Sequence, residues 1–323
     1  MDRKMIIDFH SHLWGRGFIA PGFYTYTTQQ WAAKAPDRTP DMILPKILEG
    51  IVDEDGGLYL ETMDRAGVDI SIVNMSDFGY HWCGEEPEVP MDKQLEFYGE
   101  LIQKYPDRFR FFSFFDPRRK NCLELLERAV KEYGCIGCGE ITIKGVTVAD
   151  EIMQPLFKKC LELGLPVFIH TRTGHGTEFT DEDLTHNNTA HPFHIRALQA
   201  AYPDLVIVFG HAGYDVWWEE ACRIARGNPN CYLELSDWYL ELSDPKNLIA
   251  KLACMRDMVG ADHVLFGSDQ VSGYRFCGDN AILPDWVHFM KNLPEEAKKI
   301  GYQFTKEEVD LILGDNARRI LNL

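Results

Sequence analysis

Residues 5–15 read MIIDFHSHLWG, a short apolar run that leads into two histidines. Isoleucine and phenylalanine favour an extended strand, and His10 and His12 follow at its end. On an extended backbone, residues two positions apart point to the same face. The stretch therefore predicts a buried strand that delivers two imidazole side chains together at its carboxyl end.

Seven similar runs follow along the chain, and segments with apolar residues at helical spacing separate them. The eight expected strands are Met5 to Phe9, Ile70 to Met75, Phe109 to Phe115, Ile136 to Ile143, Pro166 to His170, Leu205 to His211, Cys231 to Leu235 and Val264 to Gly267. Strands that alternate with helices form a parallel sheet through right-handed crossovers. Eight such units predict an α/β fold of the (β/α)8 TIM-barrel type, with residues 1–323 as a single barrel domain.

An open, doubly wound sheet is the alternative architecture. A dinucleotide site in such a sheet needs several glycines after the first strand, whereas residues 9–15 read FHSHLWG. A long loop insertion at about residues 13–55, rich in aromatic side chains, interrupts the barrel pattern. On a barrel this insertion belongs to the C-terminal face, where we expect it to cover a site or to form a dimer contact.

The composition limits the partners of the protein. The chain has 323 residues and a formal net charge of −17, and 45% of its residues are hydrophobic. This charge repels nucleic acid and anionic membrane surfaces, so we expect neither as a partner. The beginning of the chain lacks the apolar run of a signal peptide, and no stretch has the length of a membrane span. We therefore expect a cytoplasmic protein that acts on a small molecule, and a homodimer stays open.

Further histidines and acidic residues stand where expected strands end. His170 ends the fifth strand, His211 ends the sixth and Asp269 follows the eighth, while Glu140 lies on the fourth. The carboxyl ends of barrel strands meet at one rim. Imidazole and carboxylate groups gathered there are ligands of the type that Zn²⁺ and similar divalent ions take. The pattern predicts a divalent metal site, most simply for one or two Zn²⁺ ions.

The motifs resemble the amidohydrolase superfamily. They are IIDFHSHLWG at the first strand, LPVFIHTRTG at the fifth, VFGHAG at the sixth, LFGSD at the eighth and a closing LGDNARRIL. The resemblance is to the amidohydrolase-related branch, which includes metal-dependent hydrolases and non-oxidative decarboxylases. It implies a metal-dependent enzyme on a (β/α)8 barrel.

The resemblance also implies roles for single residues. His10, His12, His170 and Asp269 become metal ligands, and His211 either binds a second metal or polarises the substrate or water. Glu140 matches the position of a bridging acid in binuclear members; the alternative is a buried acceptor for a ligand histidine. Asp269 becomes the catalytic general base, and His211 becomes the catalytic group that stabilises an oxyanion.

Side chains of the expected loops are candidates for substrate binding. They are Arg172, His175, Tyr214, Trp238 and Arg275. An arginine can hold a carboxylate through two hydrogen bonds, and aromatic loops suit a flat substrate. We therefore expect a metal-dependent hydrolase in which activated water attacks a small amide, lactone or ester that can carry a carboxylate. The alternatives are a decarboxylase of an aromatic or unsaturated acid and a non-catalytic metal-binding barrel protein.

Overall fold

The computed structural model describes residues 4–33, 35, 37–77, 80, 84–172 and 189–323. Within this part of the chain, nine parallel strands form one sheet in the order β8-β7-β6-β5-β4-β3-β2-β1-β9. The strands are β1 (Ile7–His12), β2 (Ile70–Ser76), β3 (Phe109–Phe114), β4 (Cys138–Ile141), β5 (Val167–His170), β6 (Ile207–Gly210), β7 (Cys231–Glu234), β8 (Val264–Leu265) and β9 (Gln270–Val271). The (β/α)8 prediction is thereby confirmed.

The last expected strand is shorter than expected, and a further short strand follows it; the two together close the barrel. β8 pairs with β7, whereas β9 pairs with β1 through Ser11 and Gln270. Between them, the backbone N–H of Phe9 donates to the carbonyl of Phe266 at 3.0 Å. Asp269 lies at the break with a positive φ of 54°, a conformation that ends a strand. The chain therefore bends where it delivers Asp269.

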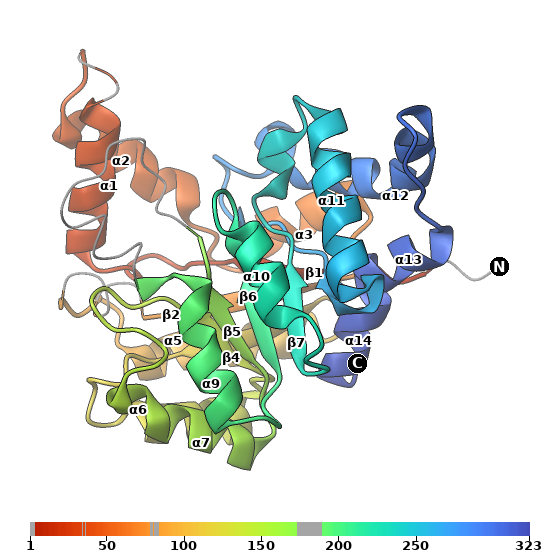
Figure 1. Cartoon of the computed structure of the whole chain (residues 1–323). Helices are drawn as coiled ribbons and strands as arrows, with labels where there is room; N and C mark the ends of the chain where they lie inside the picture. Colours follow the sequence, from red (N-terminus) through yellow and green to blue (C-terminus); the bar gives the residue numbers. More distant parts are fainter. Residues whose placement is uncertain (1–3, 34, 36, 78–79, 81–83, 173–188) are drawn as a thin grey trace.

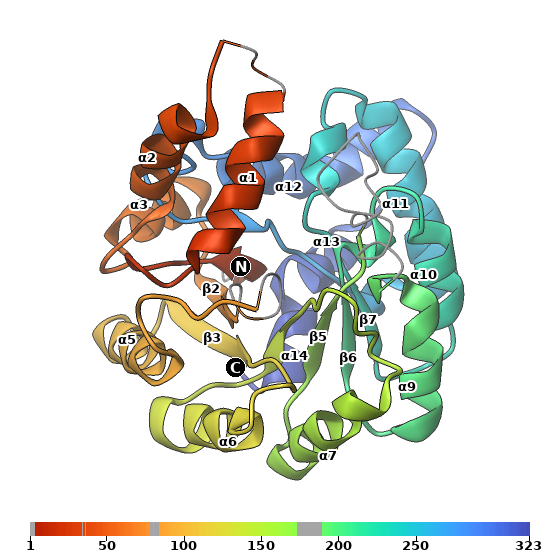
Figure 2. The same ribbon diagram turned by 90° about the vertical axis from the view of Figure 1, so that its left-hand side faces the viewer.

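Helices pack around the outside and the two ends of the barrel (Figure 2). They are α1 (Pro21–Ala33), α2 (Pro40–Ile51), α3 (Gly57–Ala66), α5 (Met91–Lys104), α6 (Cys122–Tyr133), α7 (Gln154–Leu163), α9 (Ile195–Ala201), α10 (Trp218–Ala225), α11 (Pro245–Val259), α12 (Leu283–Lys299), α13 (Lys306–Asp310) and α14 (Asn316–Leu321). None of the described helices is long and apolar enough to cross a membrane.

The insertion at residues 13–55 differs from the expected loop, because it contains helices α1 and α2. Both helices stand beyond the carboxyl ends of the strands, at the upper left of Figure 1. The two ends of the insertion meet at its base, where Trp14 forms a β-bridge with Val52. The Trp14 ring stacks on the ring of His12 at 5.3 Å between centroids. The insertion is therefore attached directly beside the end of β1.

Aromatic and aliphatic side chains fill the barrel interior below the strand ends. Phe9 makes edge-to-face contacts with Phe112 at 5.4 Å and with Phe168 at 5.7 Å between ring centroids. All three rings are fully buried, and each contributes roughly 1.5–3 kcal/mol through burial. Phe168 also contacts the ring of His10 at 4.7 Å. This apolar floor excludes water from below the polar strand ends.

The closing motif, residues 313–321, packs against the bottom of the barrel. The side-chain amide of the fully buried Asn316 donates to the carbonyls of Ala261 and Val264, each at 2.8 Å. The carbonyl of Met5 lies so close to Gly314 that a side chain there would collide with it. The motif therefore fixes the beginnings of β1 and β8, the two strands that close the barrel.

Candidate functional site

The strand ends bring six polar side chains together at the carboxyl rim of the barrel. Their sources are β1 for His10 and His12, β4 for Glu140, β5 for His170, the short 3-10 helix after β6 for His211, and the break between β8 and β9 for Asp269. His10, His12, Glu140 and His211 are buried, whereas the side chains of His170 and Asp269 are 13% and 17% exposed. The β5–β6 register explains part of this arrangement, because His170 lies beside Gly210 and thus next to His211.

Four atoms of the type that bind metal ions, two imidazole nitrogens and two carboxylate oxygens, lie close together on one side of the cluster. The Nε2 atoms of His10 and His12 lie 3.2 Å apart. Oδ1 of Asp269 lies 3.4 Å from Nε2 of His10 and 3.2 Å from Nε2 of His12. Oε2 of Glu140 lies 3.4 Å and 3.6 Å from the same two nitrogens. Groups with the spacing of a metal site include His10, His12 and Asp269, and His10 with Glu140 and His211.

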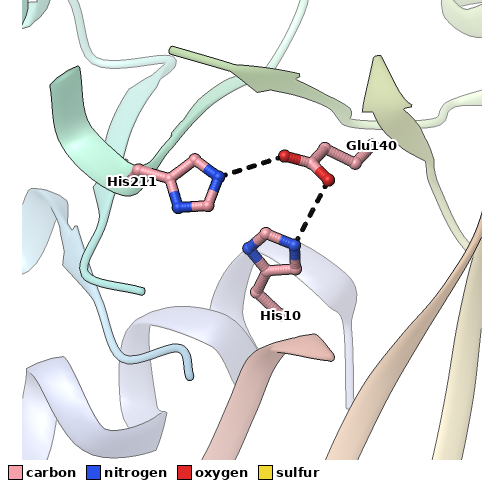
Figure 3. A group of neighbouring side chains, drawn as sticks. All are labelled: His10, Glu140 and His211. Atoms are coloured by element: carbon pink, nitrogen blue, oxygen red, sulfur yellow. Dashed lines mark hydrogen bonds and ion pairs between the residues drawn. The ribbon is translucent and has the colours of Figure 1, made fainter. Parts of the chain in front are cut away.

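Glu140 connects this group to the other two histidines. Its Oε1 atom lies 2.6 Å from Nδ1 of His170 and 3.2 Å from Nε2 of His211. Figure 3 shows the two carboxylate oxygens directed at different imidazoles, one at His10 and the other at His211. One carboxylate therefore faces both halves of the cluster.

The end of β7 supports the cluster from behind. Glu234 is fully buried, and its Oε2 atom accepts from the backbone N–H of His211 at 3.1 Å and from the Ser236 hydroxyl at 2.8 Å. The Ser236 Oγ atom also lies 2.8 Å from Nδ1 of His211 and 3.0 Å from Nδ1 of His10. Both imidazoles thus have polar partners on the side that faces away from Glu140.

Asp237 provides a second contact to His211. Its Oδ2 atom lies 3.0 Å from Nδ1 of His211 and is paired with the guanidinium of Arg172. The indole N–H of Trp238 donates to the backbone carbonyl of His211 at 2.9 Å. The residues from 234 to 238 therefore contact the backbone N–H, the backbone carbonyl and the ring of His211.

Four residues of this region have positive φ angles. The angles are 59° for His211, 49° for Ala212, 67° for Asp237 and 54° for Asp269. A positive φ is uncommon for residues other than glycine and costs of order 1–3 kcal/mol. Such conformations concentrate where packing and hydrogen bonds hold side chains for a function, and here they direct polar groups at one point.

The charges of the cluster shift its pKa values in opposite directions. Burial opposes the charged form of His10, but the charges of Glu140 and Asp269 outweigh it and raise the pKa of His10 well above its usual value. Burial also opposes the carboxylate of Glu140, yet His10 and His170 hold its pKa well below the ordinary range. Burial lowers the pKa of His170. The side chains therefore form a mixed cationic and anionic group in a buried setting.

Asp8 ties β1 to the segment that carries Asp269. Its carboxylate accepts from the backbone N–H of Ser268 at 2.9 Å, from the Ser268 hydroxyl at 2.6 Å and from the Tyr59 hydroxyl at 2.8 Å. Burial raises the pKa of Asp8 to about 6. Because Ser268 directly precedes Asp269, these bonds fix the position of Asp269 relative to His10.

The expected substrate-binding residues lie in different settings. Arg172 is largely buried in its ion pair with Asp237, and its guanidinium carbon stands 5.4 Å from the centre of the Tyr214 ring. Trp238 is fully buried, while Tyr214 and Arg275 are half-buried. The backbone N–H of Arg275 donates to the carbonyl of Gly50 at 2.9 Å, which joins this loop to α2. His175 lies outside the described residues.

Sequence reasoning missed three residues of the β7 end, namely Glu234, Ser236 and Asp237. The stretch LELSDW, residues 233–238, did contain a signal. A glutamate inside an apolar strand, followed two positions later by a serine, directs two polar groups to one face. Histidines at strand ends indicate a site by their type, whereas a glutamate and a serine do not indicate that they contact a histidine.

The chain resembles a family model and several solved structures over nearly its whole length. Residues 7–323 match the family model described as amidohydrolase. No curated protein matches the chain. One similar solved structure is a 5-carboxyvanillate decarboxylase from Novosphingobium aromaticivorans complexed with manganese and 4-hydroxy-3-methoxy-5-nitrobenzoic acid, with 17% identity, a TM-score of 0.68 and coverage of 99% of this chain and 96% of that chain.

Two more solved structures resemble the chain over nearly its whole length. A 2,6-dihydroxybenzoate decarboxylase from Rhizobium has 16% identity and a TM-score of 0.60, with 99% of each chain covered. A probable 2-pyrone-4,6-dicarboxylic acid hydrolase from Acinetobacter baumannii has 13% identity and a TM-score of 0.56, with coverage of 98% of this chain and 99% of that chain. At these identities the likeness concerns the fold.

Proposed function

The chain belongs to the amidohydrolase family, and from that premise we propose that it is a metal-dependent, non-oxidative decarboxylase of a small aromatic or unsaturated carboxylic acid. The observation that carries the proposal is the approach of one carboxylate oxygen each of Glu140 and Asp269 to the Nε2 atoms of His10 and His12, at 3.2 to 3.6 Å. The decarboxylase names of several structures with the same fold support the choice of reaction. The sequence alone favoured hydrolysis, which becomes the second candidate.

The donor set fits a divalent ion. Ligand atoms about 2.1 Å from a tetrahedral metal lie about 3.4 Å from one another. The separations between the Nε2 atoms of His10 and His12 and the facing carboxylate oxygens run from 3.2 to 3.6 Å. Two imidazoles and two carboxylates suit both Zn²⁺ and Mn²⁺. The expected Zn²⁺ stays a prediction, and the manganese in a similar structure supports Mn²⁺ as the other choice.

We propose that His10, His12, Glu140 and Asp269 hold the ion. When bound, the ion supplies a positive charge that holds the substrate carboxylate and offsets negative charge developed in the reaction. His170 contacts Glu140 and His211, and we assign to it either a ligand role or the orientation of Glu140. The apolar floor beneath the cluster keeps the site poor in water, which strengthens each of these charge interactions.

Decarboxylation needs a proton at the carbon that loses the carboxylate. The proton adds to that carbon, the bond to the carboxylate breaks, and CO₂ leaves while the electron pair of the broken bond stays with the ring. His211 suits the delivery of the proton. Burial opposes its charged form, but the hydrogen bond with Asp237 and the contact with Glu140 outweigh burial and raise its pKa to about 9. Asp269 is the other candidate for proton transfer.

We assign two of the remaining loop residues to holding His211 in place and two to contact with the substrate. We assign Arg172 and Trp238 to the support of His211, because one pairs with Asp237 and the other donates to the His211 carbonyl. Tyr214 and Arg275 are only half-buried, so we retain them as candidates for contact with the substrate ring and a carboxylate.

Hydrolysis is favoured by one observation, the likeness to a probable pyrone dicarboxylic acid hydrolase. In that reaction Asp269 would take a proton from water and return it to the leaving group, and His211 would stabilise the oxyanion. The same residues thus serve either reaction with different proton transfers.

An assay of the protein loaded with Mn²⁺ or Zn²⁺ distinguishes the reactions. Hydroxylated benzoic acids and unsaturated dicarboxylic acids are incubated with it, and CO₂ release and ultraviolet spectra are followed. Decarboxylation gives CO₂ together with a spectral change, whereas opening of a lactone consumes base without CO₂. The Asp269→Asn variant should lose turnover in either case. CO₂-free hydrolysis would overturn the main proposal, and turnover of neither class by metal-loaded protein would favour a non-catalytic barrel.

A further inference from the structure

The hydroxyl of Ser236 contacts three side chains of the site at once. Ser236 is fully buried directly after β7. Its Oγ atom lies 2.8 Å from Oε2 of Glu234, 2.8 Å from Nδ1 of His211 and 3.0 Å from Nδ1 of His10. One serine thus touches the proposed metal ligand His10 and the proposed proton-transfer residue His211, whose strands are far apart in the sequence.

The bonding capacity of a hydroxyl determines the direction of these contacts. A serine hydroxyl has one hydrogen to donate and two lone pairs to accept with. The Glu234 carboxylate can only accept, so it takes the hydrogen. The two lone pairs are then left for His10 and His211, and each of these rings must donate from Nδ1. The three contacts use the whole bonding capacity of the hydroxyl.

The other contacts of these imidazoles favour the same direction. Nδ1 of His211 also faces Oδ2 of Asp237 at 3.0 Å, and Nδ1 of His10 also faces Oε2 of Glu234 at 3.4 Å. Both additional partners are carboxylate oxygens, which accept. Glu234 is itself held, because its Oε1 atom accepts from the backbone N–H of Ser236 at 2.6 Å.

A hydrogen on Nδ1 determines what Nε2 can do. In a neutral imidazole with the hydrogen on Nδ1, Nε2 carries the lone pair and can bind a metal or accept a proton. Nε2 of His10 faces Nε2 of His12 and Oδ1 of Asp269, and Nε2 of His211 faces Glu140. Acceptor atoms so close together repel one another unless a cation or a proton lies between them, so this arrangement favours the binding of a cation or a proton.

We propose that Ser236 is a positioning residue that fixes the Nδ1–H form of His10 and His211 together, so that one hydroxyl prepares both a metal ligand and the proton-transfer residue. The proposal rests on the proposed function, since it takes His10 as a ligand of the metal. It assigns Ser236 no contact with the substrate. The residue acts through the two rings that it orients.

The test measures metal affinity, which does not depend on the identity of the substrate. Mn²⁺ and Zn²⁺ are titrated into the chelator-treated full-length protein in competition with a chromophoric chelator. Ser236→Ala should weaken binding about 10- to 100-fold, the usual effect of losing a hydrogen bond to a ligand histidine. Ser236→Cys, with a weak acceptor in place of the hydroxyl, should also weaken it, whereas Ser236→Thr should retain affinity closer to that of the wild type.

Ser113→Ala is the matched control. Ser113 is also fully buried in the barrel, and its hydroxyl contacts Cys135, outside the metal cluster. This variant should bind metal as the wild type does, so that general loosening of the barrel is separated from the loss of one oriented hydroxyl.

A second readout observes the rings directly. Long-range proton–nitrogen NMR spectra of protein labelled with ¹⁵N-histidine, with assignments from His10→Gln and His211→Gln variants, report which nitrogen of each ring carries hydrogen. The spectra are recorded at a pH at which both rings are neutral, because a charged imidazole carries hydrogen on both nitrogens. There we expect Nδ1–H for both rings in the wild type and a change in both after Ser236→Ala. Unchanged metal affinity in Ser236→Ala, or hydrogen on Nε2 of either neutral ring in the wild type, would overturn the inference. A wild-type protein that binds no divalent metal would instead overturn the proposed function.

Discussion

Oδ2 of Asp237 lies 3.0 Å from Nδ1 of His211, in a region where the side chains of both residues are at most 4% exposed. A buried carboxylate at this position holds the imidazole in one orientation, with Nε2 directed at Glu140. The pair gives His211 a fixed direction for proton transfer, and variants of Asp237 test this role.

Asp237→Asn should lower kcat about 10- to 100-fold with little change in KM, because the amide keeps the size of the carboxylate but loses its charge beside the ring. Steady-state kinetics on the first substrate identified provide the measurement. Asp244→Asn is the control, since Asp244 caps α11 away from the site and asparagine caps helices equally well. Wild-type kcat in Asp237→Asn would show that His211 does not depend on this contact.

Arg172 and Asp237 should behave as a coupled pair. Arg172→Gln removes the guanidinium from a buried carboxylate, which typically destabilises a protein by about 3–5 kcal/mol. The double variant Arg172→Gln/Asp237→Asn should recover part of this loss, and denaturant unfolding of all four proteins measures the coupling. If Arg172 instead binds the substrate carboxylate, the two effects on stability will add, and KM will rise in Arg172→Gln whether or not Asp237 is present.

Metal affinity should rise as the pH increases above about 6.5. Burial opposes the charged forms of the ligands His10 and His12, but the neighbouring carboxylates outweigh it and raise both pKa values. A metal must displace these protons, so binding strengthens as they are lost with rising pH. Titration calorimetry in buffers of different ionisation enthalpy counts the protons released. A flat affinity across this range would contradict the shifts.

The same pKa shifts affect the stability of protein from which metal has been removed. A histidine whose folded-state pKa is raised stabilises the fold fully below its unfolded pKa, and this contribution is lost as the pH rises through the folded value. The melting temperature of chelator-treated protein should therefore fall between about pH 6.5 and 9. Added Mn²⁺ or Zn²⁺ should restore it most strongly at the upper end, where the rings are neutral.

Gly267→Ala should disturb the site without replacing any metal ligand. A methyl group at this position would collide with Oε1 of Glu234 and lie 3.1 Å from Cβ of His10. Overpacking of this kind costs about 1–3 kcal/mol and displaces neighbours, so metal affinity should fall together with stability. Gly164→Ala, which strains a left-handed helix end with nothing within 4 Å, should lower stability but leave metal affinity unchanged. Wild-type affinity in Gly267→Ala would mean that Glu234 and His10 adapt freely.

Glu140→Gln should weaken metal binding by about 10-fold or more, because glutamine has one acceptor oxygen and cannot face both halves of the cluster with an acceptor. Metal content by plasma mass spectrometry, together with the competition titration, gives the number of ions and their affinity. One ion per chain, bound equally tightly after the substitution, would exclude Glu140 from metal binding.

The sequence indicated the fold because each strand is a compact apolar run between helices. It did not reveal the break in the last strand, where pairing changes from β7 to β1 around Asp269. It also did not reveal helices α1 and α2, since aromatic residues and an internal Pro45 are typical of a loop. In both places tertiary contacts outweigh local propensity.

The candidate site was predictable from the sequence at the positions where the residue type itself indicates metal binding or proton transfer. Histidines and acids at strand ends indicated His10, His12, Glu140, His170, His211 and Asp269, which the fold gathers. Ser236 and Asp237 were not predictable from type, because serine and aspartate are common after strands. Their importance depends on the distances to His10 and His211, which only the folded chain defines.

The most direct test of the account is a crystal structure of protein loaded with Mn²⁺ or Zn²⁺, with anomalous data on both sides of the metal edge. We predict an anomalous peak within bonding distance, about 2.0–2.3 Å, of Nε2 of His10, Nε2 of His12 and one carboxylate oxygen each of Glu140 and Asp269. A peak bound elsewhere, or no peak in protein that contains metal by mass spectrometry, would contradict the assignment of this cluster as the metal centre.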